Sequence, residues 1–296
     1  MTVVQPSPAL ADALDEATVT GMIGHPRFQD AVRHIGTRYL ALHADWTLHK
    51  TVADEGRYLI SQYAICLHAG YVPGRADTGL TLARLIRQCE AFGIMSHGRV
   101  EATVSLLRKT GRLLDAPSEG SRRSRRLVPS PAMESEFRDR LRFHLEALEL
   151  VRPGRDYLRR LEADPDFFWA FERYRGALVA TVPSLRLRLP GLTALAHIEG
   201  GYLVTMALIQ SIEGPIRPCE VGFPLVENAA RYNVPRTQLR RVLESLEGVG
   251  MIENLEGRVR RVRILPAAIE TMQAWHAIRL LRHDRHGARA AAERDG

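Results

Sequence analysis

The sequence predicts a mainly α-helical protein with small β-hairpins, built as two similar halves. Four sequence blocks recur in the same order, about 140 residues apart. Apolar residues elsewhere repeat at the three- and four-residue spacing of amphipathic helices. Short segments of alternating apolar and charged residues, interrupted by glycine, indicate hairpins. At 296 residues the chain has room for two domains, each with its own core.

The recurring blocks predict a tandem duplication. Residues 55–61 (EGRYLIS) recur as residues 199–205 (EGGYLVT), and residues 91–113 align without a gap on residues 230–252. Shorter blocks flank these on both sides and keep the same order: Pro26-Arg27-Phe28 with Pro165-Asp166-Phe167, and Pro131-Ala132-Met133 with Pro266-Ala267-Ala268. Chance would not preserve that order.

A turn between the two halves sets the expected domain boundary. The pair Pro153-Gly154 is a turn signal between helical stretches. We therefore expect a first domain over residues 21–155 and a second over residues 156–285. Residues 1–20 are expected to form a disordered N-terminal tail and residues 286–296 a flexible C-terminal tail.

Each half is expected to begin with helices. Amphipathic helices over residues 28–43 and 167–181 come first, and each tyrosine block lies on a second helix. Two further helices joined by a short turn follow, which is the pattern of a helix-turn-helix. In the first half, Ser96 stands at the expected start of the second helix of this pair, where a hydroxyl can cap it. The expected bounds of these helix pairs are 81–92 with 97–110, and 223–232 with 236–247.

A hairpin with a basic tip follows each helix-turn-helix. Gly111 and Gly250 end the preceding helices. The expected strands lie at residues 112–114 and 127–128 in the first half, and at 251–252 and 259–265 in the second. Long helices over residues 132–151 and 267–282 close the two halves. The expected fold class is therefore α+β, mainly α with small β-hairpin wings, in two winged helix-turn-helix domains related by internal duplication.

Positive charge is concentrated in these predicted units. The net charge is +7, and residues 84–126 hold ten Arg or Lys against four Asp or Glu. Residues 231–263 hold eight Arg against four Glu, so the rest of the chain is net negative. A basic cluster at the same place in both halves favours nucleic acid as the partner.

The order of elements resembles the MarR (multiple antibiotic resistance regulator) family of winged-helix transcription regulators. The resemblance covers nearly the whole of both halves. It is most specific over residues 96–114: a serine, a short polar start, an apolar row, a glycine and an apolar strand. Both hairpins lack the family's Asp-x-Arg pair, and Pro131 and Pro266 stand in place of its Leu-Thr-x-x-Gly segment. The family's homodimers place one recognition helix per subunit in the major groove. The resemblance thus implies a single-chain pseudo-dimer, monomeric or further oligomerised.

The expected partner is double-stranded DNA. A recognition helix presents its N-terminal residues to base edges, where arginine reads guanine and glutamine reads adenine. We expect base contacts from Arg99, Arg236, Gln238 and Arg240, and phosphate or minor-groove contacts from the hairpin arginines. The two helices differ in sequence, which predicts a poorly palindromic operator. The whole expected set is Ser96, His97, Arg99, Arg108, Lys109, Arg122, Arg123, Arg125, Arg126, Arg236, Thr237, Gln238, Arg240, Arg241, Arg258, Arg260 and Arg261.

No enzymatic site, metal site or cofactor is expected. The cysteines Cys66, Cys89 and Cys219 lie far apart, and the eleven histidines form no metal-binding pair with a nearby acid. No apolar run approaches the roughly 18 residues of a membrane span, and the first residues do not resemble a secretory signal. These features predict a cytoplasmic, non-enzymatic protein with no membrane partner.

Three alternatives remain open at this stage. A plasmid-type replication initiator also carries two winged-helix domains in one chain and binds repeated origin sites. A structural protein could use winged helices for protein contacts. For the aromatic helix that begins at Phe167, a small-molecule effector site is the alternative to simple core packing.

Overall fold

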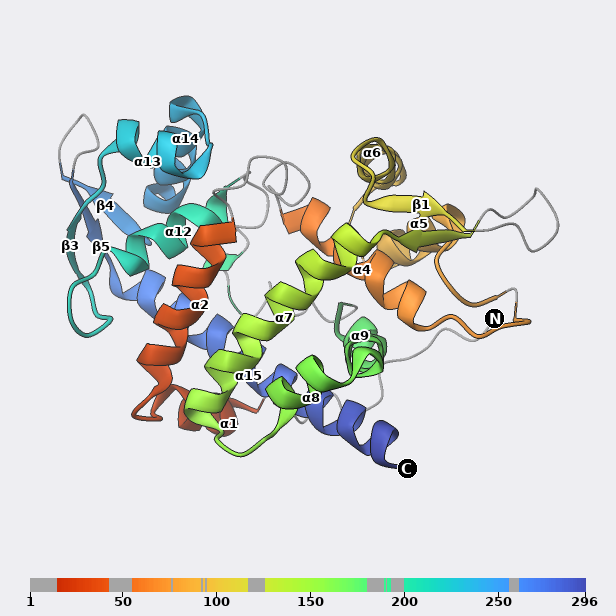
Figure 1. Ribbon diagram of the computed structural model, residues 1–296. Helices are drawn as coiled ribbons and strands as arrows, with labels where there is room; N and C mark the ends of the chain where they lie inside the picture. The colour runs from red at the N-terminus through yellow and green to blue at the C-terminus, as the bar shows by residue number, and fades with distance from the viewer. Residues whose placement is uncertain are drawn as a thin grey trace. The chain divides into compact units, whose positions relative to one another are not determined.

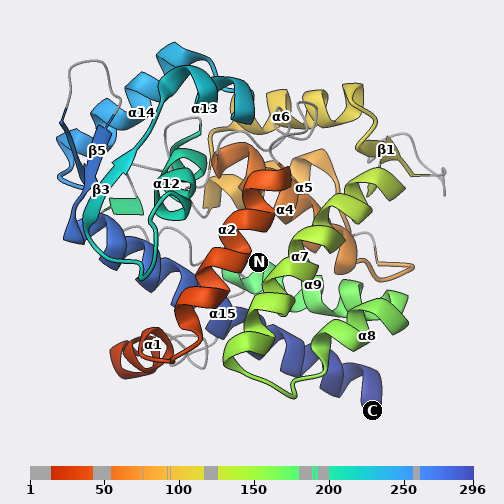
Figure 2. The ribbon, with the colours of Figure 1, turned by 60° about the vertical axis from the view of Figure 1, so that its left-hand side comes forward.

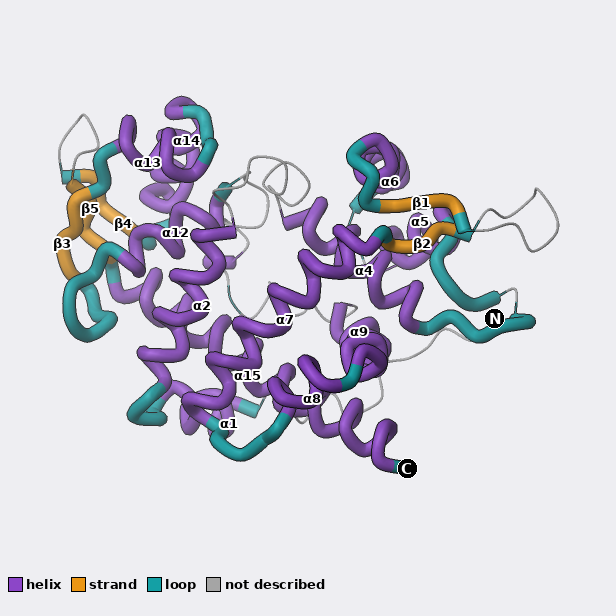
Figure 3. Tube along the Cα trace, viewed as in Figure 1, coloured by secondary structure: helices purple, strands orange, loops and turns teal. Residues whose placement is uncertain are grey.

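The computed structural model describes residues 15–42, 55–75, 77–91, 93, 95–116, 126–179, 189, 191–192, 200–255 and 261–296. The fold is mainly helical, with two small antiparallel sheets (Figure 3). The chain divides into two compact units. Unit 1 comprises residues 1–55, 146–154 and 185–283, and unit 2 comprises residues 56–145, 155–184 and 284–296.

This division differs from the expected succession of domains 21–155 and 156–285. The reason lies in the packing of α2 (Phe28–Leu42), which joins α12 (Gly201–Gln210) in unit 1. Gly36 allows this close crossing, because a Cβ there would lie 2.6 Å from the Met206 methyl carbon. The Arg33 guanidinium also donates to the Ile212 carbonyl oxygen at 2.9 Å. Short-range sequence patterns carry no signal for such pairings.

Unit 1 combines helices with a three-stranded sheet. Besides α2 and α12 it contains α1 (Glu16–Ile23), α13 (Leu225–Tyr232), α14 (Arg236–Gly248) and the first part of α15 (Pro266–Asp295). The sheet order is β3-β5-β4, with β3 (Cys219–Gly222), β4 (Ile252–Asn254) and β5 (Arg261–Ile264), all pairs antiparallel. Helices α13 and α14 lie side by side next to this sheet in both views (Figure 1 and Figure 2). The sequence predicted β4 and β5 but not β3.

Unit 2 has a related local order of elements. Helix α4 (Glu55–Ala69) precedes α5 (Leu82–Ala91) and α6 (His97–Lys109), and a two-stranded sheet of β1 (Leu113–Asp115) and β2 (Leu127–Pro129) follows. Most of α7 (Pro131–Val151) belongs to this unit, as do α8 (Tyr157–Ala163) and α9 (Pro165–Val179). Arg112, expected on the first strand, is instead buried beside it and pairs with Glu136 of α7 at 2.6 Å.

The repeated tyrosines are packing residues in both units. Arg175 donates to the Tyr58 hydroxyl at 3.0 Å, and it also pairs with the fully buried Glu172 at 3.0 Å. Arg279 donates to the Tyr202 hydroxyl at 3.3 Å. Buried polar groups need such partners, since an unpaired buried carboxylate would cost several kcal/mol. The aromatic helix α9 likewise buries Phe167, Phe168 and Phe171 in the core of unit 2.

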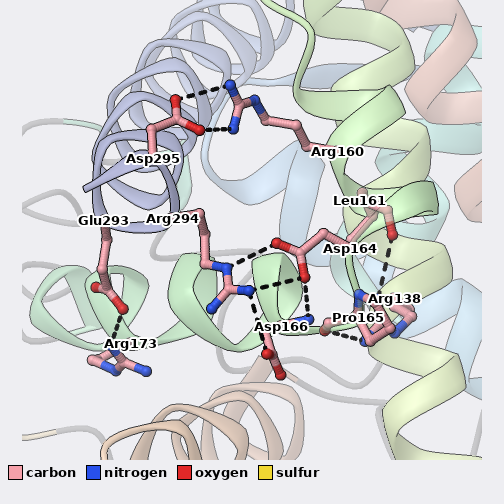
Figure 4. Close-up of polar contacts among 10 residues, drawn as sticks. All are labelled: Arg138, Arg160, Leu161, Asp164, Pro165, Asp166, Arg173, Glu293, Arg294 and Asp295. Atoms are coloured by element: carbon pink, nitrogen blue, oxygen red, sulfur yellow. Dashed lines mark hydrogen bonds and ion pairs between the residues drawn. The ribbon is translucent and has the colours of Figure 1, made fainter.

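The two expected tails are partly helical. Helix α1 begins at Glu16, and the Asp15 side chain accepts a hydrogen bond from the Thr18 amide at 2.8 Å. At the other end, α15 continues to Asp295, and ion pairs to α9 and to the segment around α8 hold its last turn (Figure 4). Arg160 pairs with Asp295 at 2.7 Å and Arg294 with Asp164 at 2.8 Å, while Glu293 pairs with Arg173. These partners are more than 100 residues away along the chain, so composition alone suggested fraying.

Candidate nucleic-acid interface

The clearest candidate surface is the exposed face of α14 in unit 1. Asn233 adopts a left-handed conformation, φ 54°, which turns the chain sharply between α13 and α14. Helix α14 then begins at Arg236, as the sequence predicted. One face of α14 is fixed by an apolar row in the core: Leu239, Val242, Leu243 and Leu246. The opposite face is therefore held towards solvent.

Arginines dominate the N-terminal half of that face. Arg236, Arg240 and Arg241 are exposed, and so is Arg231 on the last turn of α13. None of these four guanidinium groups forms an ion pair with any residue that the structure describes. Thr237 is exposed between them, whereas Gln238 is half-buried. The positive end of the helix dipole lies at the same place and adds to the positive potential.

The C-terminal half of α14 has the opposite charge. Glu244 and Glu247 are exposed there. Glu247 accepts hydrogen bonds from the Asn254 backbone amide at 2.8 Å and from its side-chain amide at 2.7 Å, which ties the helix to β4. A polyanion would therefore be attracted to the first half of α14 and repelled from the second. This gradient matches the orientation in which a recognition helix points its N-terminus at base edges.

The corresponding surface in unit 2 is less cationic. Helix α6 begins at His97, with Ser96 at the expected N-cap position, but the Ser96 hydroxyl makes no capping hydrogen bond. The imidazole of His97 lies between two carboxylates: its Nε2 is 3.4 Å from Oε1 of Glu101, and its Nδ1 is 3.8 Å from Oε1 of Glu90. Arg108 pairs with Asp115 at 2.8 Å. Arg99 and Lys109 are exposed, so α6 presents mixed charge.

The hairpin arginines divide into three groups. Arg122, Arg123, Arg125, Arg258 and Arg260 lie outside the described residues. Arg126 is half-buried, with its guanidinium carbon 4.1 Å from the centre of the Tyr71 ring, a cation–π contact. Arg261 pairs with Glu220 of β3 at 2.8 Å. The sequence predicted that Arg126 and Arg261 contact DNA, but in the structure both guanidinium groups already have a partner within the chain.

Sequence reasoning missed the carboxylates that engage these cations. Glu90, Glu101 and Asp115 were counted only in the net charge of their segment. Glu220 lies on β3, whose only sequence signal is the alternation Cys219-Glu220-Val221-Gly222 after a proline. Four residues of alternation are too few to distinguish a strand from a loop.

The geometry suits ionic and hydrogen-bonded contact with a polyanion. Among the described residues no group of His, Cys, Asp or Glu side chains is arranged to hold a metal ion. Within the same residues, no helix is both long and apolar enough to cross a bilayer. The sequence matches no protein-family model and no curated protein, and no solved structure matches this chain.

Proposed function

We propose that this chain is a sequence-specific transcription regulator that binds double-stranded DNA. In this proposal α5–α6 with β1–β2, and α13–α14 with β4–β5, are two winged helix-turn-helix domains derived from a tandem duplication. Helices α6 and α14 are the two non-identical recognition helices. The observation that carries the proposal is the exposed row of arginines at the start of α14, which form no ion pair with any described residue.

The charge on α14 supports contact with phosphate and base edges. Arg236 and Arg240 are four residues apart, so they lie on the same side of the helix. Arginine binds phosphate and the guanine edge through a planar fork of N–H donors. Release of counterions from the phosphates makes such binding strongly dependent on salt. The exposed arginines of α14 are therefore suited to binding a phosphate backbone.

Duplex DNA fits this face better than a single strand. Binding of single strands relies on aromatic side chains that stack on unpaired bases. The described exposed face of α14 carries Arg236, Thr237, Arg240, Arg241 and two glutamates, and no aromatic residue. Its contacts are therefore of the kind that follow a regular phosphate backbone and a groove edge.

The test is direct binding of the purified chain to DNA. A duplex enriched from a random pool, and a scrambled duplex of equal length, are titrated by fluorescence anisotropy at 50 and 200 mM salt. We expect the enriched duplex to bind at least about 1,000-fold more tightly than the scrambled one, with affinity falling steeply as salt rises. Failure to enrich any duplex, with equally weak binding to all DNA, would reject the proposal. Enrichment of direct repeats would instead favour a replication initiator.

A further inference from the structure

The outer face of the β3-β5-β4 sheet carries charged side chains in register. Glu220 lies directly opposite Arg263 across the β3–β5 pair, and Glu253 lies directly opposite Arg263 across the β4–β5 pair. Residues opposite each other in an antiparallel pair point to the same face, and Arg261, two residues before Arg263, shares it. The other face buries Val221, Val262 and Ile264. Charge and apolar residues are thus cleanly separated.

Glu220 bridges the two arginines of β5. Its two carboxylate oxygens, Oε2 and Oε1, lie 2.8 Å from a guanidinium nitrogen of Arg261 and of Arg263 respectively. Arg263 also pairs with Glu253 at 2.6 Å. The hydrogen bond from Arg263 lowers the pKa of the Glu220 carboxyl, which therefore remains ionised at neutral pH. Two carboxylates balance two guanidiniums, so these four described side chains carry no net charge together.

The sheet therefore differs from its neighbour α14. Both elements are rich in arginine and belong to unit 1. On α14 the arginines of the first half have no carboxylate partner among the described residues, whereas on β5 both arginines do. Opposite Arg261 lies Gly222, which has no side chain, so Glu220 is the cross-strand acid that holds Arg261.

We infer that Glu220 is a specificity-determining residue. It neutralises Arg261, and with Glu253 it neutralises Arg263, so the sheet does not bind the phosphates of DNA of any sequence. This inference rests on the proposed function. Phosphate contacts add affinity for any DNA and carry no direct sequence information. Without Glu220, Arg263 would keep Glu253 as a partner, but Arg261 would lose its described carboxylate. A sheet with Arg261 unpaired would raise the affinity for non-specific DNA and reduce the ratio of specific to non-specific binding. With Glu220 present, discrimination depends on the helix.

The test compares Glu220→Gln with the intact chain. Removal of the carboxylate should raise affinity for a scrambled duplex about three- to tenfold at 100 mM salt, and steepen the salt dependence by about one phosphate contact, because Arg263 keeps Glu253 as its partner. Affinity for the enriched duplex should rise less, so the specificity ratio falls. The charge-matched control is Glu270→Gln, an exposed carboxylate on α15 without an ion pair among the described residues. It should change affinity for the scrambled duplex less than twofold.

A second variant keeps the inference testable if Glu220→Gln disturbs the sheet. In the intact chain Arg261 is already neutralised, so Arg261→Gln alone should change affinity for the scrambled duplex less than twofold. Arg241→Gln removes an arginine without a described ion pair. This substitution should lower the affinity for the scrambled duplex several-fold. An unchanged or weaker affinity in a folded Glu220→Gln, an equal gain in Glu270→Gln, or a large loss in Arg261→Gln would each overturn the inference. If the intact chain binds no duplex at all, the proposed function itself fails.

Discussion

At the scale of single residues, the surroundings of a side chain decide what it can do, and the residue type alone does not. Arg236 and Arg261 look alike in the sequence, but one has no described ion pair and the other is held by a glutamate. Tyr58 and Tyr202 occupy the same place in the two repeated blocks, and each accepts a hydrogen bond from an arginine distant in sequence. Two residues outside the interface give sharp tests of the packing.

Gly287 should tolerate no side chain. A Cβ at this position would lie 2.5 Å from a ring carbon of Tyr157, whose hydroxyl bonds to Asp284 and whose ring stacks on Phe167. Gly287→Ala should therefore destabilise the fold by about 1–3 kcal/mol, the usual cost of overpacking. Gly98→Ala is the matched control, since it also lies in a helix of unit 2 and has open space around it.

Gly98→Ala should stabilise by up to about 1 kcal/mol, because alanine favours helix. Urea denaturation of the two variants gives both values. Equal effects of the two substitutions would show that the Tyr157 contact is not tight.

His276 should make stability depend on pH. It is fully buried on α15, and its Nε2 lies 3.3 Å from the Met206 sulfur. Burial, with Arg279 nearby, lowers the pKa of His276 to about 3. The unfolded chain takes up this proton near pH 6.5 and the folded chain does not, so stability falls as pH drops from about 6.5 towards 3.

His276→Leu should remove this contribution. The free energy of unfolding of the variant minus that of the intact chain should increase by about 2 kcal/mol as the pH falls from 7.5 to 5. Urea denaturation at the two pH values measures it. A difference that stays constant with pH would mean that His276 takes up its proton in the folded state as well.

At the scale of elements, most helices and both hairpins could be predicted. The apolar rows of α6 and α14 and the positions of Gly111 and Gly250, which have positive φ, are confirmed. Strand β3 and helix α8 were missed, because each is short and depends on long-range partners for stability. The end of α15 was misjudged for the same reason: its ion-pair partners are Arg160 on α8, Arg173 on α9 and Asp164 between these helices, all distant in sequence.

The last turn of α15 should depend on those ion pairs. Replacing Glu293, Arg294 and Asp295 with Gln, Gln and Asn removes all three sets of pairs shown in Figure 4. Exposed ion pairs contribute little each, so overall stability should fall by less than about 2 kcal/mol. Hydrogen exchange of the backbone amides near residue 290 should accelerate at least tenfold, because the helix end frays. Unchanged exchange would mean that apolar packing alone holds this turn.

At the scale of the whole molecule, the sequence indicated two similar halves but not how the chain is divided. The repeat predicted two successive domains, whereas the compact units are each made of three separate segments. Local periodicity reveals which residues form a helix, but not which distant helix covers it. The charge distribution could be predicted by segment, although the pairing that neutralises β5 could not.

The proposed duplication predicts an asymmetric operator. The exposed residues at the start of α6 are His97 and Arg99, and those of α14 are Arg236, Thr237 and Arg240. If α6 and α14 act as recognition helices, as we propose, they should prefer two different half-sites. Selection from random duplex DNA should therefore return a poorly palindromic sequence, and a perfect palindrome bound by a monomeric chain would contradict it.

DNA recognition by α14 is tested most directly by the DNA affinity of the chain carrying Arg236→Gln and Arg240→Gln. The control carries Arg152→Gln and Arg217→Gln, which remove two exposed arginines from outside the helix-turn-helix segments. Both are titrated by fluorescence anisotropy against the enriched duplex at fixed salt. We expect a loss of about 30-fold or more for the α14 variant, from at least ~1 kcal/mol per arginine, and less than threefold for the control. Equal losses in the two variants would show that only total charge matters, and that α14 is not the recognition helix.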